Sequence, residues 1–356
     1  GEQAVLCDAS GRALGVAFVN PHSLICARLA RRGDETPVGR DWLQERLGAA
    51  LALRERWFPQ PFYRLAYGDS DGLPGLVVDR YGDDLVVQVG TAGMESLLAE
   101  VVEALDALLA PRGILLRNDT SVRELEQLPS YTRVAAGEVP EFLELSENGA
   151  RFRVSAREGQ KTGWFFDHRA GRARVASLAA GRRVLDVFSY VGAWGVQAAV
   201  AGAGSVTCID SSGPALALAA QNAQLNGVES RMRFIEAQAL AGIQGLAAEG
   251  ERFDIVVLDP PAFIKRRKDQ KSGEHAYQKL NRAAMDLLAD DAILVSASCS
   301  MHLPEEGLLD ILRHAAVQTG RNLQVLEFLG QGPDHPVHPA IPETRYLKTL
   351  VARVSV

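Results

Sequence analysis

The stretch Val184-Leu185-Asp186-Val187-Phe188-Ser189-Tyr190-Val191-Gly192-Ala193-Trp194-Gly195 decides the fold, because it has the order of a strand, a tight turn and a helix start. The apolar residues at its beginning predict a buried strand, and the glycine-containing segment predicts the turn. A second apolar run, about 20 residues further on, ends in Cys208-Ile209-Asp210. A carboxylate at that strand end can accept both hydroxyl groups of a ribose.

The turn also indicates which kind of cofactor it would bind. A dinucleotide needs Gly-x-Gly-x-x-Gly, which brings the backbone close to a pyrophosphate, and this pattern is absent from the turn. Asp186, Phe188 and Tyr190 better suit S-adenosylmethionine, whose charged part is a sulfonium and an amino acid. The alternative is a plain sheet fold with a glycine turn and no ligand.

Strand and helix patterns alternate from about residue 165 to the end of the chain, which predicts an α/β domain with a doubly wound, mostly parallel sheet. The last two strands lack a clear helix between them and are expected to form an antiparallel hairpin. The seven predicted strands are Arg183–Val187, Ser205–Ile209, Met232–Ile235, Phe253–Leu258, Ala292–Ser296, Leu323–Phe328 and Tyr346–Val354.

The residues before this domain predict two smaller regions. Short strands separated by turns are expected within residues 1–30, and an amphipathic helix over residues 41–57. Residues 62–155 predict an α+β region of strands around a helix at 96–109. Asn148-Gly149 between two apolar runs is a strong hairpin signal.

Composition restricts the class of protein. A chain of 356 residues is too long for one compact core, so two or three domains are expected. No apolar run is long enough to span a bilayer and no signal peptide is visible, and the four cysteines are far apart, which fits a reducing cytoplasm. The net charge of −6 excludes a basic nucleic-acid binder overall, but a local basic face could still bind RNA.

Two chemically active side chains follow neighbouring predicted strands. The strand Phe253–Leu258 ends in Asp259-Pro260-Pro261, and the strand Ala292–Ser296 is followed by Ser298-Cys299-Ser300. If both strands are parallel, the carboxylate and the thiol lie together at the carboxyl edge of the sheet, where open α/β sheets place their chemistry. A thiol there can act as a nucleophile, although most cysteines are small buried hydrophobes.

The loop after Asp259 suits a nucleobase. Its two prolines fix the backbone and remove two N–H donors, so the loop offers carbonyls and a carboxylate, and Phe263 could stack on a base. Lys265, Arg266 and Arg267 follow directly and could contact phosphates. An ordinary strand-ending loop and a solvated basic loop are the alternatives.

Together these segments resemble a known family, the bacterial 23S rRNA (cytosine-5)-methyltransferases. The resemblance also rests on residues 158–169 (Glu-Gly-Gln-Lys-Thr-Gly-Trp-Phe-Phe-Asp-His-Arg) and on Asp334-His335-Pro336-Val337. It implies a partial PUA-like β domain at 1–40, a linking helix at 41–60, a central α+β domain at 61–157 and a seven-stranded, Rossmann-like class I methyltransferase domain at 158–356. Because Gly1 stands within a strand-like pattern, we expect the PUA-like domain to lack its first half.

The resemblance implies a function and a set of site residues. The function is formation of 5-methylcytosine, expected in large-subunit rRNA, through a covalent adduct between Cys299 and cytosine, with Asp259 as the second catalytic residue. The expected contacts of S-adenosylmethionine are Lys161, Phe166, Asp167, Arg169, Asp186, Phe188, Ser189, Tyr190, Gly192, Asp210, Ser211, Gln238, Ala239, Asp259 and Pro260. The expected substrate contacts are Pro261, Phe263, Lys265, Arg266, Arg267 and His335.

The chain departs from the family at three residues. Gln238 stands where an acidic residue is expected near the adenine, and Trp164 and His168 stand where phenylalanine and glutamine are expected. No metal site is expected, and exposed strands of the central domain could pair in a homodimer. Two other functions stay open: methylation of a base nitrogen, and a non-catalytic RNA-binding or ribosome-assembly role.

Overall fold

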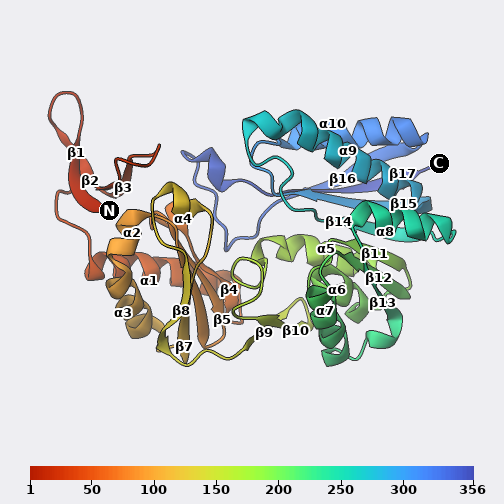
Figure 1. Ribbon diagram of the computed structural model, residues 1–356, viewed down its shortest axis with the longest axis horizontal. Helices are drawn as coiled ribbons and strands as arrows, with labels where there is room; N and C mark the ends of the chain where they lie inside the picture. The colour runs from red at the N-terminus through yellow and green to blue at the C-terminus, as the bar shows by residue number, and fades with distance from the viewer. The chain divides into compact units, whose positions relative to one another are not determined.

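The computed structural model describes all 356 residues, and their contacts group into two units (Figure 1). Unit 1 comprises Gly1–Leu145, Val154–Phe166 and Pro333–Thr344, and unit 2 comprises Ser146–Arg153, Asp167–Gly332 and Arg345–Val356. This division differs from the predicted boundary between residues 157 and 158, because residues 146–153 belong to unit 2 and residues 158–166 and 333–344 belong to unit 1.

Hydrogen bonds explain the placement of residues 146–153 and 333–344. In unit 2, Asn222 Oδ1 accepts from the backbone N–H of Arg153 at 2.8 Å, and Asn226 Oδ1 accepts from that of Arg151 at 2.9 Å. In unit 1, Arg54 Nη2 donates to the carbonyl of Asp334 at 2.8 Å. Side chains far away in sequence therefore satisfy the backbone of each segment, which a reading of local patterns does not detect.

The N-terminal part of unit 1 is an antiparallel sheet with the strand order β1-β2-β3. The strands are β1 (Glu2–Cys7), β2 (Ala13–Val19) and β3 (Ala27–Arg32). The short strands predicted in this region are thus confirmed, although β3 extends to Arg32, beyond the predicted range of residues 1–30.

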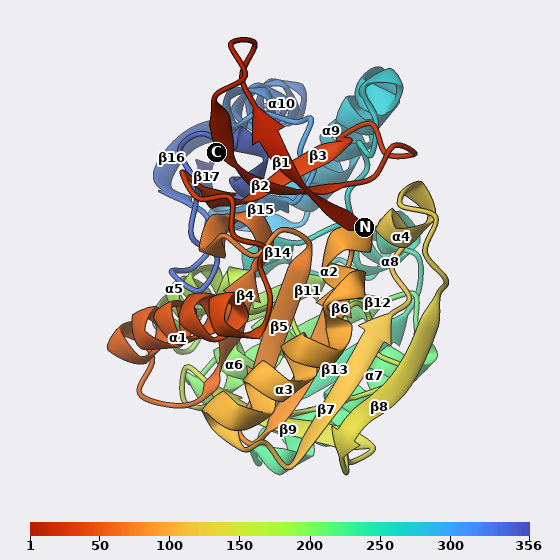
Figure 2. The same ribbon diagram turned by 90° about the vertical axis from the view of Figure 1, so that its left-hand side faces the viewer.

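Helix α1 (Arg40–Trp57) was predicted as a linker between domains, and its position in the sequence is confirmed. Its role differs from that prediction, because Trp42, Leu43 and Leu47 are fully buried in one core with residues of the β4–β8 sheet. α1 and α3 lie side by side over a face of that sheet (Figures 1 and 2). The helix is therefore part of the central α+β fold.

The central sheet has five strands in the order β4-β5-β6-β7-β8. β6 and β7 pair in parallel, and the other neighbours are antiparallel. The chain segments are β4 (Phe62–Tyr67), β5 (Leu76–Tyr81), β6 (Asp84–Val89), α2 (Ala92–Ser96), α3 (Leu98–Leu109), β7 (Gly113–Asn118), α4 (Val122–Leu125) and β8 (Tyr131–Gly137).

The predicted hairpin is confirmed as β9 (Phe142–Glu147) and β10 (Ala150–Ser155). Asn148 and Gly149 have φ values of 50° and 83°. Two consecutive residues with positive φ form the turn that matches the twist of a two-residue hairpin, and asparagine followed by glycine adopts it at the lowest cost.

Unit 2 contains a seven-stranded sheet in the order β13-β12-β11-β14-β15-β17-β16. All seven predicted strands are present, and the terminal β16–β17 hairpin is antiparallel as expected. The strands are β11 (Arg183–Val187), β12 (Ser205–Asp210), β13 (Met232–Glu236), β14 (Phe253–Leu258), β15 (Leu288–Ser298), β16 (Asn322–Leu329) and β17 (Lys348–Ser355).

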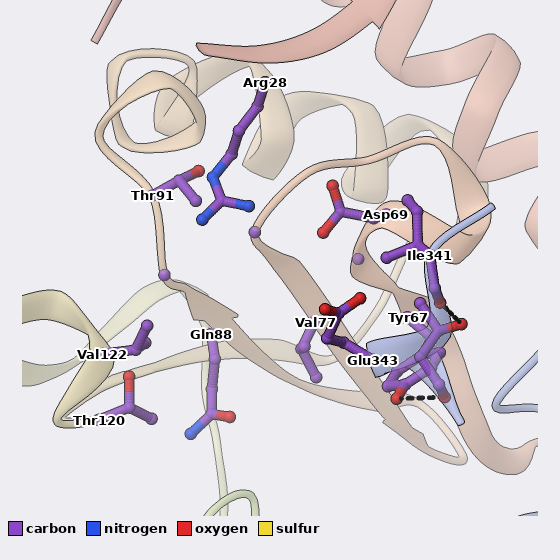
Figure 3. Close-up of a pocket in the computed structure, with 14 residues that line it drawn as sticks. Arg28, Tyr67, Asp69, Val77, Gln88, Thr91, Thr120, Val122, Ile341 and Glu343 are labelled. Atoms are coloured by element: carbon purple, nitrogen blue, oxygen red, sulfur yellow. Dashed lines mark hydrogen bonds between the residues drawn. The ribbon is translucent and has the colours of Figure 1, made fainter. Parts of the chain in front are cut away.

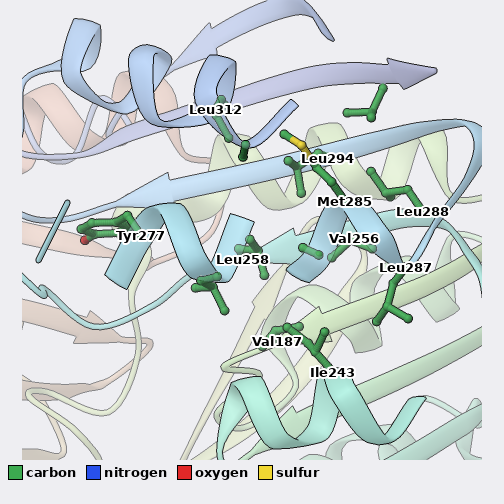
Figure 4. Packing of buried hydrophobic residues seen from close by; sticks show 14 of the residues in the cluster. Val187, Ile243, Val256, Leu258, Tyr277, Met285, Leu287, Leu288, Leu294 and Leu312 are labelled. Carbon is green, nitrogen blue, oxygen red and sulfur yellow. The ribbon is translucent and has the colours of Figure 1, made fainter. Parts of the chain in front are cut away.

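Helices cover both faces of this sheet (Figure 1). α5 (Arg169–Leu178), α6 (Ala193–Val200) and α7 (Gly213–Leu225) lie on one face. α8 (Ala239–Ala248), α9 (Gln270–Asp286) and α10 (Glu305–Thr319) lie on the other. The core between this second group and the sheet includes Val256, Leu258, Met285 and Leu294 (Figure 4). No helix in the chain is both long and apolar enough to cross a membrane.

Candidate active site at the sheet edge of unit 2

The turn after β11 has an unusual backbone. Phe188 and Tyr190 adopt φ values of 66° and 49°. This left-handed backbone conformation is rare for residues other than glycine. Gly192 follows at 81° and precedes α6. Such local strain is typical of ligand-binding segments, because the surrounding fold must hold it in place.

Asp186 and Ser189 offer buried polar atoms beside this turn. Asp186 is fully buried, and its Oδ2 accepts from the backbone N–H of Gly195 at 2.9 Å. Its Oδ1 and the Ser189 hydroxyl have no hydrogen-bond partner within the protein. Burial raises the pKa of Asp186 to about 7, although the N–H of Gly195 opposes the shift. An amino group is the kind of donor that this carboxylate lacks.

Gly195 is a site residue whose role the motif alone did not reveal. A Cβ at this position would lie 2.8 Å from Cys208 Sγ and 3.2 Å from Asp186 Oδ2. The absence of a side chain therefore lets the start of α6 approach Asp186 and donate its N–H.

The carboxylate at the end of β12 is also held by backbone donors. Asp210 accepts from the N–H of Tyr190 at 2.8 Å and from that of Ser212 at 2.9 Å, one bond to each oxygen. Each oxygen keeps acceptor capacity, so the predicted ribose contact stays a prediction. Ser211 follows it in an exposed position, Gln238 is exposed just before α8, and Ala239 begins that helix.

The predicted pairing of Asp259 and Cys299 at one sheet edge is present. β14 and β15 are parallel neighbours with Leu258 opposite Ser296, so Asp259 and Cys299 both follow the carboxyl ends of paired strands. Cys299 is half-buried. Pro260 is buried and Pro261 exposed.

Asp259 has two side-chain partners that were not predicted. His168 Nε2 lies 3.1 Å from Oδ1, and Trp194 Nε1 donates to Oδ2 at 3.1 Å. Burial favours the neutral forms of both ionisable groups, but their mutual attraction prevails. It lowers the pKa of Asp259 below its usual 3.8 and raises that of His168 above its usual 6.5.

The two serines beside Cys299 belong to one buried network. Ser298 Oγ donates to Tyr277 Oη at 2.9 Å, and Tyr277 Oη lies 3.0 Å from Ser300 Oγ. Ser300 Oγ also accepts from the N–H of Ile264 at 3.2 Å. The network therefore joins the loop of Cys299 to the loop of Asp259, and it fixes both strand ends.

The predicted substrate contacts in unit 2 lie on the same loop. The ring centroids of Phe263 and Tyr277 are 4.8 Å apart. Phe263 is only half-buried, so part of it stays available for stacking on a base. Lys265, Arg266 and Arg267 are exposed. Their contact with phosphate stays a prediction.

The remaining predicted residues fall in both units. In unit 2, Asp167 accepts from the Tyr346 hydroxyl, and Arg169 Nε lies 3.5 Å from Glu147. In unit 1, Lys161 lies over the Phe165 ring, and Phe166 packs on Tyr81.

His335, predicted to contact substrate, lies in unit 1 with its Nδ1 3.0 Å from Asp334 and its ring 5.1 Å from that of Tyr67. It is buried, which favours a structural role for its imidazole in holding residues 333–344.

Unit 1 has a cavity of its own, with a volume of about 330 Å³ (Figure 3). Its walls include Arg28, Gln88, Asp69 and Glu343, and none of the predicted site residues lines it. The chain thus has a pocket of mixed polarity in unit 1 as well as the carboxyl sheet edge of unit 2.

Comparisons with known proteins agree with this geometry. Residues 122–353 match the family model of S-adenosylmethionine-dependent methyltransferases. The chain is similar to proteins named ribosomal RNA large subunit methyltransferase I. It is 35% identical to the one from Pseudoalteromonas atlantica over 96% of this chain and 87% of that protein, and 35% identical to the one from Yersinia pestis over 99% and 91%.

Solved structures show the same fold. A methyltransferase complexed with SAH has a TM-score of 0.86 at 21% identity, over 99% of this chain and 91% of its own. A SAM-dependent methyltransferase from Streptococcus mutans has a TM-score of 0.85 at 20% identity, with the same coverage.

Proposed function

The chain belongs to the family of S-adenosylmethionine-dependent methyltransferases, and on that premise we propose that it forms 5-methylcytosine in large-subunit rRNA. The observation that carries the proposal is the position of Cys299 and Asp259 after paired parallel strands. The names of the relatives at 35% identity support rRNA as the substrate.

The residues at the β11–β12 edge fit the cofactor. The buried Oδ1 of Asp186 and the Ser189 hydroxyl could accept from the amino group of the methionine part, and Asp210 from the ribose hydroxyls. S-Adenosylmethionine, when bound, supplies an electrophilic methyl group on its sulfonium. The fixed carboxylates and the turn from Phe188 to Gly192 would hold it in place.

Cys299 would supply the nucleophile that the reaction needs. Carbon-5 of cytosine is a poor nucleophile, but a bond between the Cys299 sulfur and carbon-6 turns the 5,6 double bond into an enamine-like system. Methylation at carbon-5, loss of the carbon-5 proton and cleavage of the sulfur–carbon bond then restore the aromatic base and the thiolate.

Asp259 would orient the base. Its lowered pKa keeps it ionised, so it would accept from the exocyclic amino group of cytosine. Negative charge develops on the ring nitrogen when the thiolate adds, and the raised pKa of His168 keeps a proton within reach of Asp259. The Asp259–His168 pair could therefore donate a proton to the ring nitrogen while the thiolate adds.

RNA contacts are assigned to exposed groups near the sheet edge. Phe263 would stack on the target base, and Lys265, Arg266 and Arg267 would contact the phosphates. We also propose that the β1–β3 sheet is PUA-like, and that strands of the central domain could pair in a homodimer.

The test uses the full chain with S-adenosylmethionine and a 23S rRNA transcript in which 5-fluorocytidine replaces cytidine. We expect a covalent adduct that peptide mass spectrometry assigns to Cys299, because fluorine at carbon-5 blocks the final elimination. With unmodified RNA, nucleoside mass spectrometry should detect 5-methylcytosine. Methyl groups on a base nitrogen, or full activity of Cys299→Ala, would contradict the proposal.

A further inference from the structure

Lys348 is a buried cation next to the proposed nucleophile. It is the first residue of β17, and it pairs with Ser298 of β15, the residue before Cys299. Its exposed fraction is only 6%. A lysine is rarely buried to this degree unless its ammonium has partners.

The ammonium of Lys348 bonds to the backbone on both sides of this edge. Nζ donates to the carbonyl of Ser300 at 2.6 Å and to that of Tyr346 at 2.7 Å. The first bond fixes the residue directly after Cys299. Since an ammonium has three N–H groups, these two bonds leave one for another acceptor.

The local charges connect Lys348 to the thiol. Burial lowers the pKa of Lys348 to about 8, and the charge of Cys299 opposes this shift. The other charged groups that act on Lys348 are Arg345, which lowers its pKa, and Glu305, which raises it, and these two pair with each other at 3.2 Å. Tyr277 faces Cys299 from α9, and burial raises its pKa, so it stays neutral.

We propose that Lys348 is the positioning residue of Cys299: it anchors the strand end through the Ser300 carbonyl, and its ammonium stabilises the thiolate. The proposal deepens the proposed function, on which it rests for the role of Cys299 as nucleophile. An ordinary thiol titrates at about 8.5, so only a few per cent is thiolate at pH 7. A neighbouring cation would raise that fraction about tenfold for each pH unit by which it lowers the titration midpoint.

The experiment measures alkylation of Cys299 by iodoacetamide from pH 6 to 10, without RNA or cofactor. The exposed cysteines Cys7 and Cys26 are replaced by serine, and peptide mass spectrometry follows Cys299. Lys348→Gln keeps an N–H donor but removes the charge, Lys348→Arg keeps the charge, and Lys279→Gln removes an exposed lysine of α9 as the control.

We expect a midpoint about one unit below 8.5 for the parent protein and the Lys279→Gln control. Lys348→Gln should raise the midpoint by about one unit and slow alkylation at pH 7 about tenfold. Lys348→Arg should stay near the parent value. An unchanged midpoint in a folded Lys348→Gln protein, or equal shifts in the Gln and Arg variants, would overturn the proposal.

A reciprocal measurement covers the case in which Lys348→Gln does not fold. Acetylation of Lys348 is followed against pH in the parent and in Cys299→Ser, which loses only the thiol. Because coupling between two sites is mutual, the midpoint of Lys348 should fall in Cys299→Ser, and an unchanged midpoint would reject the pair. Neither titration needs methylation, so absence of 5-methylcytosine would contradict the proposed function alone.

Discussion

The two ends of the unit 2 sheet edge handle buried polar groups in opposite ways. At the β11–β12 end, Asp186 Oδ1 and the Ser189 hydroxyl have no partner within the protein. At the β14–β15 end, Asp259 has His168 and Trp194, and Ser298 and Ser300 share Tyr277. The first end is built to receive donors from a ligand, and the second to hold its own groups in a fixed arrangement around Cys299.

The ionisation of Asp186, which is fully buried, and of Asp259, which is half-buried, follows from this difference. Burial raises the pKa of Asp186 to about 7, and the backbone N–H of Gly195 and the charge of Arg172 oppose this shift without cancelling it. Burial also tends to raise the pKa of Asp259, but the interaction with His168 outweighs burial and lowers this pKa. The same side chain is thus poised to change charge near neutral pH at one end and kept ionised at the other.

The largest effect is expected when the thiol is removed from the β14–β15 end. Cys299→Ala should lower the rate of methyl transfer by roughly 10³-fold or more, as for other nucleophile knockouts. Transfer of radiolabelled methyl groups to rRNA measures it, and calorimetry should show cofactor affinity within about twofold of the parent. Cys26→Ala, at an exposed position in unit 1, is the control. Loss of cofactor affinity in Cys299→Ala would show that the two ends are not independent.

The next effect concerns the ion pair of the β14–β15 end. Asp259→Asn should slow methyl transfer roughly 10²- to 10³-fold, because the amide cannot accept from cytosine and exchange a proton with His168 in the same way. NMR titration should show the pKa of His168 falling, since burial is then opposed only by the more weakly acting charge of Asp167. An unchanged His168 pKa would refute the pairing.

This ion pair also sets a pH window for stability. The lowered pKa of Asp259 contributes stability above its unfolded value of 3.8, which is lost as the pH falls through the folded value. The raised pKa of His168 contributes stability below 6.5, which is lost as the pH rises through its folded value. Asp259→Asn should therefore destabilise the protein most between about pH 4 and 6.5 in thermal unfolding.

Local patterns predicted the seven strands of the unit 2 sheet and the relation of Asp259 to Cys299, because strand periodicity and parallel pairing determine them. They could not predict His168 as the partner of Asp259, or Lys348 beside Cys299, since these contacts join residues distant in sequence. The packing of α1 on the β4–β8 sheet could not be predicted for the same reason. An amphipathic pattern indicates that one face of a helix is buried, but it does not identify the element that covers this face.

The third effect concerns the β11–β12 end and depends on pH. Because the pKa of Asp186 is about 7, its carboxyl group must lose a proton below that pH before it can bind a cationic amino group. Cofactor affinity should therefore fall about tenfold for each pH unit below 7. Asp186→Asn should weaken binding by roughly 10- to 100-fold at pH 8 and abolish this pH dependence. Calorimetry from pH 5.5 to 8.5 measures both. A slope that persists in the variant would assign the proton to another group.

The smallest effect is expected for the sulfur of the β11–β12 end. Cys208 is fully buried, and burial raises its pKa well above the ordinary value, so it stays a neutral thiol. Cys208→Ala should cost about 1 kcal/mol of stability through the small cavity that it leaves, which corresponds to a Tm lower by about 2–4 °C. Methyl transfer and Cys299 alkylation should stay within about twofold of the parent, because a buried neutral thiol takes no part in either. A large loss of turnover with little change in Tm would mean that the chemistry is shared between both ends of the edge. It would remove the distinction on which the other predictions depend.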